Sequence, residues 1–384
     1  MDVRHYFESV DFSEYSGIGP LKWSYTLGAG IEKTMKTFNP DKQDQIDIAI
    51  LGIPSDISTE YGISEAPDSI RKELYQLANI NKNITIADFG NLKISKTAKE
   101  NYQAVRDLVE YFRDLNILTI LLGGSQDLTI GICDAFHNNP FFSLSIVDFC
   151  LDIKKGKEPL NSKNYLTQLF RQNPDLLQFN LIGYQSYFVP SAYFSKTKGI
   201  NQHLRLGLVR ENIKLAEPIF RNSDVISFDI NAVQYGNLPG FTDISPNGLR
   251  GEEACQLARY AGNANRVKVF GVFENSPDPH ASPISFKLTS QIIWYFLEGF
   301  TNRVSESIKS SEYHTVYKVE VENVDYPIVF IRDLQNGQWW MEVNTIHDGR
   351  HHFACSEEEY MQAKNNEIPE LWLKYVQKTD EILK

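Results

Sequence analysis

The sequence is poor in cysteine and in long apolar runs. Its 384 residues include only 4 cysteines, which lie far apart and show no paired spacing, so a disulfide scaffold is excluded and a reduced, intracellular protein is expected. No stretch reaches the roughly 18 apolar residues of a membrane-spanning helix, and the first residues contain no apolar signal-peptide core. These absences predict a cytoplasmic protein with no membrane span.

Basic residues are also few relative to acidic ones. The chain has 38 Lys and Arg against 49 Asp and Glu, a formal net charge of −11. Nucleic acids and anionic membranes are bound by clustered positive charge, so neither is expected as a partner. The hydrophobic share of 42% and the charged share of 23% are ordinary for a folded domain and exclude a disordered chain.

Apolar runs alternate with helical patterns between residues 46 and 304, after a polar and aromatic N-terminal arm over residues 1–45. The predicted strands are residues 46–56, 84–90, 117–124, 143–149, 176–184, 224–230 and 266–274. The predicted helices are residues 67–78, 98–116, about 127–137, 163–171, 251–262 and 285–300. This alternation predicts an α/β domain with three layers, α/β/α, around a mostly parallel sheet.

The pattern changes over residues 305–384, which we predict to be a C-terminal α+β extension. Asn336-Gly337 between two apolar runs indicates a β-hairpin. Ser356 and Glu359 have the spacing of a helix capping box.

The extension contains residues that could serve an interface or a metal. Trp339 and Trp340 are neighbours on the predicted hairpin, so one indole should pack on the main domain while the other is available to a protein partner. Four potential zinc ligands lack the two tight pairs of a zinc site, and we interpret them as a solvated loop. They are His347, His351, His352 and Cys355.

Polar residues cluster where three predicted strands end, the edge at which parallel sheets carry their chemistry. The clusters are residues 123–127, 148–152 and 227–231. Alternate residues of an extended segment face the same way, so Asp148 and Asp152 should converge. Carboxylates that meet repel one another unless a cation or protons neutralise them. Each aspartate could also be a turn or capping residue.

At these positions the sequence resembles the ureohydrolases, the family of arginase, agmatinase and formimidoylglutamase. The family's ordered motifs are Gly-Gly-Asp-His, Asp-Ala-His-x-Asp, Ser-x-Asp-x-Asp and Glu-x-Asn-Pro. The chain has Gly-Gly-Ser-Gln at 123–126, Asp-Phe-Cys-Leu-Asp at 148–152, Ser-Phe-Asp-Ile-Asn at 227–231 and Glu-Asn-Ser-Pro at 274–277. The resemblance spans about residues 46–303, and its segment 158–170 is most similar to formimidoylglutamases. It implies an arginase-like fold and a homo-oligomer.

The resemblance also implies the positions of six ligands that hold two manganese ions in the family. In this chain they are Gln126, Asp148, Cys150, Asp152, Asp229 and Asn231. The family's two histidines and one of its four aspartates are therefore replaced. Gln126 and the three remaining aspartates form an all-oxygen set suited to one Mn²⁺, Mg²⁺ or Ca²⁺. Cys150 and Asn231 suit a second manganese poorly.

Two functions are compatible with these residues. The leading hypothesis is a degenerate family member, with one divalent cation or none, that acts as a binding, scaffolding or regulatory protein. The alternative is a hydrolase of linear C–N bonds in an amidine resembling formimidoylglutamate, agmatine or arginine, which uses one metal or an unconventional pair, with two manganese ions only in that case. Glu274 matches the family's glutamate that holds the cationic group of the substrate, so a small amidine ligand is implied.

Two other residues are candidate catalytic groups. Cys150 could be a nucleophile, but neighbouring carboxylates would raise the pKa of its thiol, so a packing role is preferred. His280 is expected to lie in a surface loop.

Overall fold

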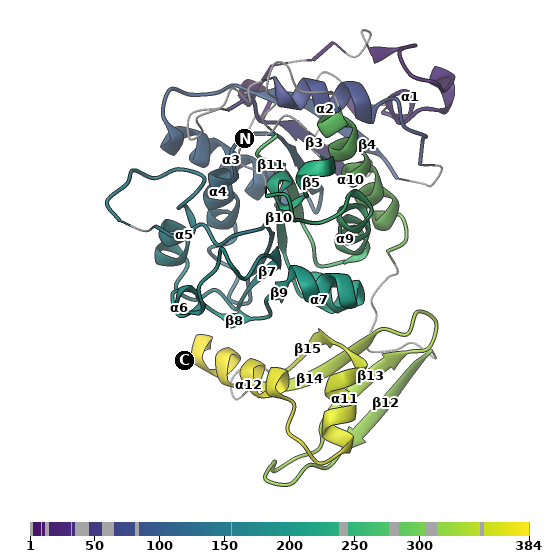
Figure 1. Cartoon of the computed structure of the whole chain (residues 1–384). Coiled ribbons are helices and arrows are strands. Elements are labelled where there is room, and N and C mark those ends of the chain that lie inside the picture. The colour runs from purple at the N-terminus through teal and green to yellow at the C-terminus, as the bar shows by residue number, and fades with distance from the viewer. Residues whose placement is uncertain are drawn as a thin grey trace.

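The predicted strands assemble into one large sheet in the computed structural model (Figure 1). The structure describes residues 3–8, 10–11, 15–31, 33–34, 46–55, 65–80, 84–154, 156–237, 245–275, 284–303, 313–345 and 349–383. Within them eleven strands pair in the order β1-β4-β3-β5-β11-β10-β6-β7-β8, with β2 on β4 and β9 on β7. All these pairs are parallel except β1 with β4. The predicted mostly parallel sheet is confirmed.

The strands of this sheet are short, and the central strands are fully buried. They are β1 Phe7–Glu8, β2 Lys33–Thr34, β3 Ile48–Gly52, β4 Ile86–Leu92, β5 Leu118–Leu122, β6 Ser143–Val147, β7 Gln178–Tyr184, β8 Ile200–Asn201, β9 Leu204–Arg205, β10 Val225–Asp229 and β11 Val269–Phe273. Every residue of β5, β6, β10 and β11 is buried. Strands covered on both faces need such continuous apolar runs.

Helices cover both faces of the sheet and make the outer layers (Figure 1). They are α1 Leu27–Gly30, α2 Ala66–Leu74, α3 Ala98–Asp114, α4 Thr129–Asp134, α5 Leu166–Gln172, α6 Ser191–Phe194, α7 Leu206–Glu211, α8 Ala216–Arg221, α9 Gly251–Asn263 and α10 Ile284–Phe300. Side chains of α2, α8, α9 and α10 form one buried apolar cluster with the sheet. Those of α3, α4 and α5 form a second cluster on the opposite face. None of the helices in the described residues is long and apolar enough to cross a membrane.

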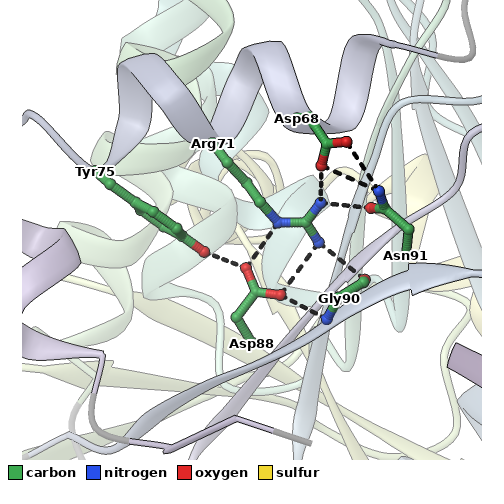
Figure 2. A network of polar contacts seen from close by, with 6 residues as sticks. All are labelled: Asp68, Arg71, Tyr75, Asp88, Gly90 and Asn91. Atoms are coloured by element: carbon green, nitrogen blue, oxygen red, sulfur yellow. Dashed lines mark hydrogen bonds and ion pairs between the residues drawn. The ribbon is translucent and has the colours of Figure 1, made fainter. Parts of the chain in front are cut away.

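A buried ion pair joins α2 to the strand β4 (Figure 2). The Arg71 guanidinium donates to both carboxylate oxygens of Asp88, at 2.8 and 3.1 Å, and both side chains are 0% exposed. Arg71 also donates to the Gly90 carbonyl at 2.9 Å, and the Tyr75 hydroxyl donates to Asp88. Asp68, which is half-exposed, completes the network on the outer side of the guanidinium. The two charges are thus fully compensated away from water.

The C-terminal extension forms a separate four-stranded antiparallel sheet with two helices (Figure 1). Its elements are β12 His314–Val319, β13 Ile328–Asp333, β14 Trp339–Thr345, β15 Gly349–Cys355, α11 Glu357–Lys364 and α12 Glu370–Ile382. Asn336-Gly337 lies in the turn that joins β13 to β14, as predicted. Ser356 and Glu359 form the predicted capping box at the start of α11. The α+β extension is therefore confirmed.

Of the predictions for the two tryptophans, packing of one indole on the main domain is confirmed, and availability of the other to a partner is wrong. Trp339 and Trp340 do lie on opposite faces, but each is only 4% exposed, so neither indole is available to a partner. Trp340 packs under the Arg221 guanidinium of the main domain at 4.7 Å, whereas Trp339 stacks on Tyr360 of α11 at 4.8 Å between ring centroids. The helix α11 that covers Trp339 comes later in the chain, where the hairpin pattern cannot reveal it.

The predicted solvated loop is instead the strand β15. His351, His352 and Cys355 belong to it and pair with β14, and the Cys355 side chain is buried. The sequence pattern does not predict this strand, because only its last three residues are buried and polar histidines precede them. His347 lies outside the described residues.

Asn222, just after α8, holds the extension to the main domain. Its side-chain amide donates to the Ala354 carbonyl at 2.8 Å and accepts from the Ala354 amide at 2.8 Å, which satisfies the outer edge of β15 as a neighbouring strand would. It also donates to the Tyr375 hydroxyl of α12 at 3.1 Å. Tyr375 in turn donates to Gln178 of β7 at 2.7 Å. The junction is therefore polar and directional.

Replacing Asn222 with Ala is expected to lower the free energy of unfolding by about 2–4 kcal/mol, because it leaves buried backbone groups of Ala354 without partners. Chemical denaturation followed by circular dichroism measures the loss, and hydrogen exchange at the Ala354 amide should accelerate. The matched control is Lys318→Ala on the exposed side of β12, for which a change within about 0.5 kcal/mol is expected. Equal stability of the two variants would contradict the assignment.

Candidate metal centre

The polar clusters found in the sequence follow four strands that are neighbours in the sheet. The order β5-β11-β10-β6 lies at its centre. Gln126 follows β5, the segment 148–152 follows β6, Asp229 ends β10 and Glu274 follows β11. The strands are parallel, so all these residues lie at one edge of the sheet. The strand order explains why segments far apart in the sequence meet.

Asp148, Cys150 and Asp152 converge as their spacing predicts. Their potential ligand atoms all lie within 4.8 Å of one another. The Asp148 carboxylate accepts a hydrogen bond from the Cys150 amide at 3.2 Å, and the Cys150 thiol donates to Asp152 Oδ1 at 3.3 Å. The thiol therefore already has a carboxylate partner.

Asp229 interacts with these acids, and Asn231 bonds it through both its backbone and its side chain. Asp229 Oδ1 accepts a hydrogen bond from the Asn231 amide at 2.7 Å, and Asp229 is 5% exposed. The negative charges of Asp152 and then Asp229 add to burial in raising the pKa of Asp148 well above its usual range. Asp229 is thus close enough to interact with the aspartates that follow β6.

Gln126 is fully buried, and its backbone amide donates to the Glu274 carboxylate at 2.7 Å. Its Nε2 is 3.3 Å from the Ser227 hydroxyl, to which it donates, and that hydroxyl is 2.9 Å from Thr129. Its Oε1 has no hydrogen-bond partner among the described residues. An unpaired buried carbonyl oxygen is costly in a folded protein, and a bound cation would satisfy it.

Glu274 is positioned by the segment that follows β5. Its backbone takes the left-handed conformation, with φ of 59°, which is strained for a residue other than glycine. Its amide donates to the Gly124 carbonyl at 3.0 Å, and its Oε1 accepts from the Gln126 amide at 2.7 Å. Ser162 provides a further side-chain hydrogen bond. These contacts fix the carboxylate beside the aspartates.

Burial and mutual repulsion make the cluster resist ionisation. Burial is the main cause that raises the pKa of Asp148 and of Asp229 well above the usual range, and the Glu274 charge is the next cause for Asp229. Burial likewise raises the pKa of Glu274 to about 7, partly opposed by the hydrogen bond from the Gln126 amide. A cation bound among these carboxyl groups would reduce their mutual repulsion.

Burial and the charges of Asp152 and Asp148 raise the pKa of the Cys150 thiol well above its usual range. A neutral thiol is a poor nucleophile, so the structure supports the preference for a packing role. His280 lies outside the described residues.

The sequence patterns did not reveal Tyr165 and Ser162 as members of the site. Tyr165 is fully buried and its hydroxyl has no hydrogen-bond partner among the described residues. After burial, the charges of Asp152 and Asp148 raise its pKa. Both residues lie in segment 158–170. The similarity of this segment to formimidoylglutamases is the one feature of the sequence that could have indicated their role.

A family model described as the arginase family matches residues 46–298. The match spans the whole sheet from β3 and every residue of the cluster just described.

The chain belongs to the arginase family.

Several solved structures share the fold of this chain. Formiminoglutamase from Trypanosoma cruzi, determined with Mn²⁺, has a TM-score of 0.64 at 18% identity, over 73% of this chain and 99% of that one. Formimidoylglutamase from Bacillus subtilis has a TM-score of 0.60 at 17% identity, over 68% and 89%. Agmatine ureohydrolase from Thermoplasma volcanium has 0.58 at 21%, over 75% and 97%. No curated protein sequence matches the chain.

The residues of this arginase-family site fit one metal ion better than two. Asp148, Asp152, Asp229 and the unpartnered Gln126 Oε1 offer oxygen atoms of the kind that hard cations prefer. Cys150 offers a thiol that is protonated and hydrogen-bonded, and such a group must lose its proton before it binds a metal.

The acidic cluster should give the metal-free protein an unusual dependence of stability on pH. A carboxyl whose pKa is raised on folding binds more protons in the folded state, so its contribution to stability falls as pH rises through the window between the unfolded and folded values. For Glu274 that window runs from about 4.3 to about 7. In the presence of a chelator, Glu274→Gln should therefore gain stability relative to the wild type as pH rises from about 5 to about 8.

The expected gain is on the order of 3 kcal/mol, measured by urea denaturation at each pH. Gln at this position keeps an acceptor oxygen for the Gln126 amide. Glu322→Gln, at an exposed position of the extension, is the control and should show no such trend. A stability difference between Glu274→Gln and the wild type that stays constant with pH would contradict the assignment.

Proposed function

We propose that this arginase-family protein has lost the two-manganese hydrolytic centre, holds one hard divalent cation or none, and acts as a binding, scaffolding or regulatory protein. One observation carries the proposal. Two of the six ligand positions implied by the family are occupied by Cys150 and Asn231, and the Cys150 thiol is protonated and bonded to Asp152. The second metal therefore lacks the ligands that manganese prefers.

The loss bears directly on chemistry. A bound metal ion supplies a nucleophile at neutral pH by lowering the pKa of water. In this chain the remaining groups can hold a cation and orient a ligand, and Glu274, whose pKa burial raises to about 7, already accepts a hydrogen bond from the Gln126 amide. Asp148 and Asp229 are both driven toward their protonated forms by burial and by neighbouring acids. Ligand binding is the function that these groups support best.

The ligand that we propose is a small amidine cation. Glu274 matches the family's substrate-holding glutamate, and Asp152 and Asp127 lie close enough for their charges to raise its pKa. A cation placed among these acids would relieve their repulsion. Self-assembly into an oligomer and a protein partner on the extension also remain proposals, and that partner would contact surfaces other than the two buried tryptophans.

The alternative is a hydrolase of linear C–N bonds in amidines, formimidoylglutamate-like, that uses one metal or an unconventional pair. The unpartnered Gln126 Oε1 and the three buried aspartates at the same edge of the sheet favour it, because oxygen atoms of this kind suit a bound cation. In such an enzyme Glu274 would hold the cationic group of the substrate.

Metal analysis of the purified full-length chain, after incubation with Mn²⁺ and removal of free ions, separates the two functions. We expect at most one ion per chain, and no urea, ammonia or formamide from a panel of amidines that includes arginine, agmatine and formimidoylglutamate. Two tightly held ions or turnover of any member of the panel would overturn the proposal. Asp148→Asn is the control, since it should abolish whatever metal binding the wild type shows.

A further inference from the structure

A cavity outside the acidic centre carries the opposite charge. It has a volume of about 340 Å³ and opens between the segment after β6, helix α5 and the chain after α6. Four of the seven residues that line it are basic, and none is acidic. They are Lys154, Arg171, Lys196 and Lys198. In a chain with a net charge of −11, such a local concentration of positive charge is not expected from composition.

The four basic side chains are available to a ligand. None of them forms an ion pair with any residue in the part of the chain that the structure describes. Arg171, Lys196 and Lys198 are exposed at the mouth of the cavity, and Lys154 is half-buried. The Lys196 ammonium lies over the Tyr193 ring at 4.9 Å. An anion held in the cavity would bring together and neutralise these positive charges.

Hydrogen bonds hold the wall of the cavity in place. Thr167 Oγ1 accepts a hydrogen bond from the Lys154 amide at 2.7 Å, and the Leu166 amide donates to the Asp152 carbonyl at 3.1 Å. These two bonds fasten the start of α5 to the segment that carries Lys154. Because the Thr167 oxygen already accepts, its hydroxyl proton is left to donate to a ligand. Phe170 and Ile153, both buried, complete the lining.

We propose that this cavity binds a small phosphate-bearing anion. A guanidinium presents a planar fork that matches phosphate oxygens, while ammonium groups act as point charges and a hydroxyl donates one further bond. The volume suits a small metabolite, and the concave shape distinguishes the site from the flat basic surface that a polyanion or a membrane requires. The site lies outside the acidic cluster, so the inference is independent of the proposed function.

Calorimetric titration of the full-length chain with inorganic pyrophosphate tests the proposal, in metal-free buffer at about 0.02 M ionic strength, where charges are weakly screened. We expect binding of one pyrophosphate per chain. Arg171→Glu combined with Lys196→Glu should weaken it by about tenfold or more. Arg171→Lys should weaken it less, because the charge remains and only the fork is lost. Both positions are exposed, so folding should be unaffected, and thermal unfolding checks this.

Lys72→Glu combined with Lys318→Glu is the matched control, since it changes the net charge equally at two exposed positions away from the cavity. Its affinity should stay within about twofold of the wild type. Absence of binding, equal weakening by the control, or citrate bound as tightly as pyrophosphate would each overturn the assignment of a phosphate site.

Discussion

Asp88→Asn is expected to destabilise the protein by about 3–5 kcal/mol, because it leaves the Arg71 guanidinium charged, buried and uncompensated. Both side chains of the pair are 0% exposed, so water cannot replace the lost carboxylate. Asp88 also accepts from the Tyr75 hydroxyl and from the Gly90 amide, and Asn offers one acceptor oxygen where the carboxylate offers two. Asp88 therefore holds three members of the network in Figure 2, which are Arg71, Tyr75 and Gly90.

Urea denaturation followed by circular dichroism measures the effect, with Asp68→Asn as a control from the same network. Asp68 bonds the same guanidinium at 3.1 Å, but its side chain is 49% exposed, so a loss of no more than about 1 kcal/mol is expected. Arg71→Met combined with Asp88→Leu should recover part of the stability, because neither charge is then stranded. A loss at Asp88 no larger than at Asp68 would show that the buried pair is not critical.

Restoring three ligand positions should restore the second metal. The variant Gln126→His, Cys150→His, Asn231→Asp is expected to hold two Mn²⁺ ions per chain, whereas at most one is expected for the wild type. The reason is the chemistry of the donors, since imidazole and carboxylate replace an amide oxygen, a protonated thiol and a neutral amide. Metal analysis and titration calorimetry measure the number of ions and their affinity.

The control for this experiment is Asp148→Asn in the restored background. The resemblance makes Asp148 one of the two aspartates that bridge the metals, so its loss should remove both ions. Thermal unfolding in a chelator shows whether each variant is folded before metal is added. A folded restored variant that binds no more manganese than the wild type would refute the correspondence of these positions with the family's ligands.

Much of the fold could be predicted because its signals are local. The apolar runs that became β5, β6, β10 and β11 are each buried along their whole length, and helix α3 shows its amphipathic face in sequence. The short helices α6, α7 and α8 were not predicted, because spans of four to six residues carry too few turns to show a period. Strand β15 was missed because its partner β14 and the main domain, rather than its own pattern, decide which residues it buries.

Part of the site could also be predicted from local sequence signals. Asp148, Cys150 and Asp152 lie on one extended segment, so their convergence follows from the alternation of side chains. Tyr165 and Ser162 are brought to the acids by a loop and could not be found in this way. The phosphate cavity is similar, since Lys154, Arg171 and Lys196 come from three separate segments.

The sequence by itself determined the elements, the family resemblance and the identity of the residues at the strand ends, because periodicity and motif spacing are properties of short segments. Only the tertiary structure decided that β11 lies between β5 and β10. That order brings Glu274 to the Gln126 amide, 148 residues away, and packs four carboxyl groups where burial raises the pKa of at least three. Strand order depends on contacts between distant parts of the chain, and no local pattern encodes them.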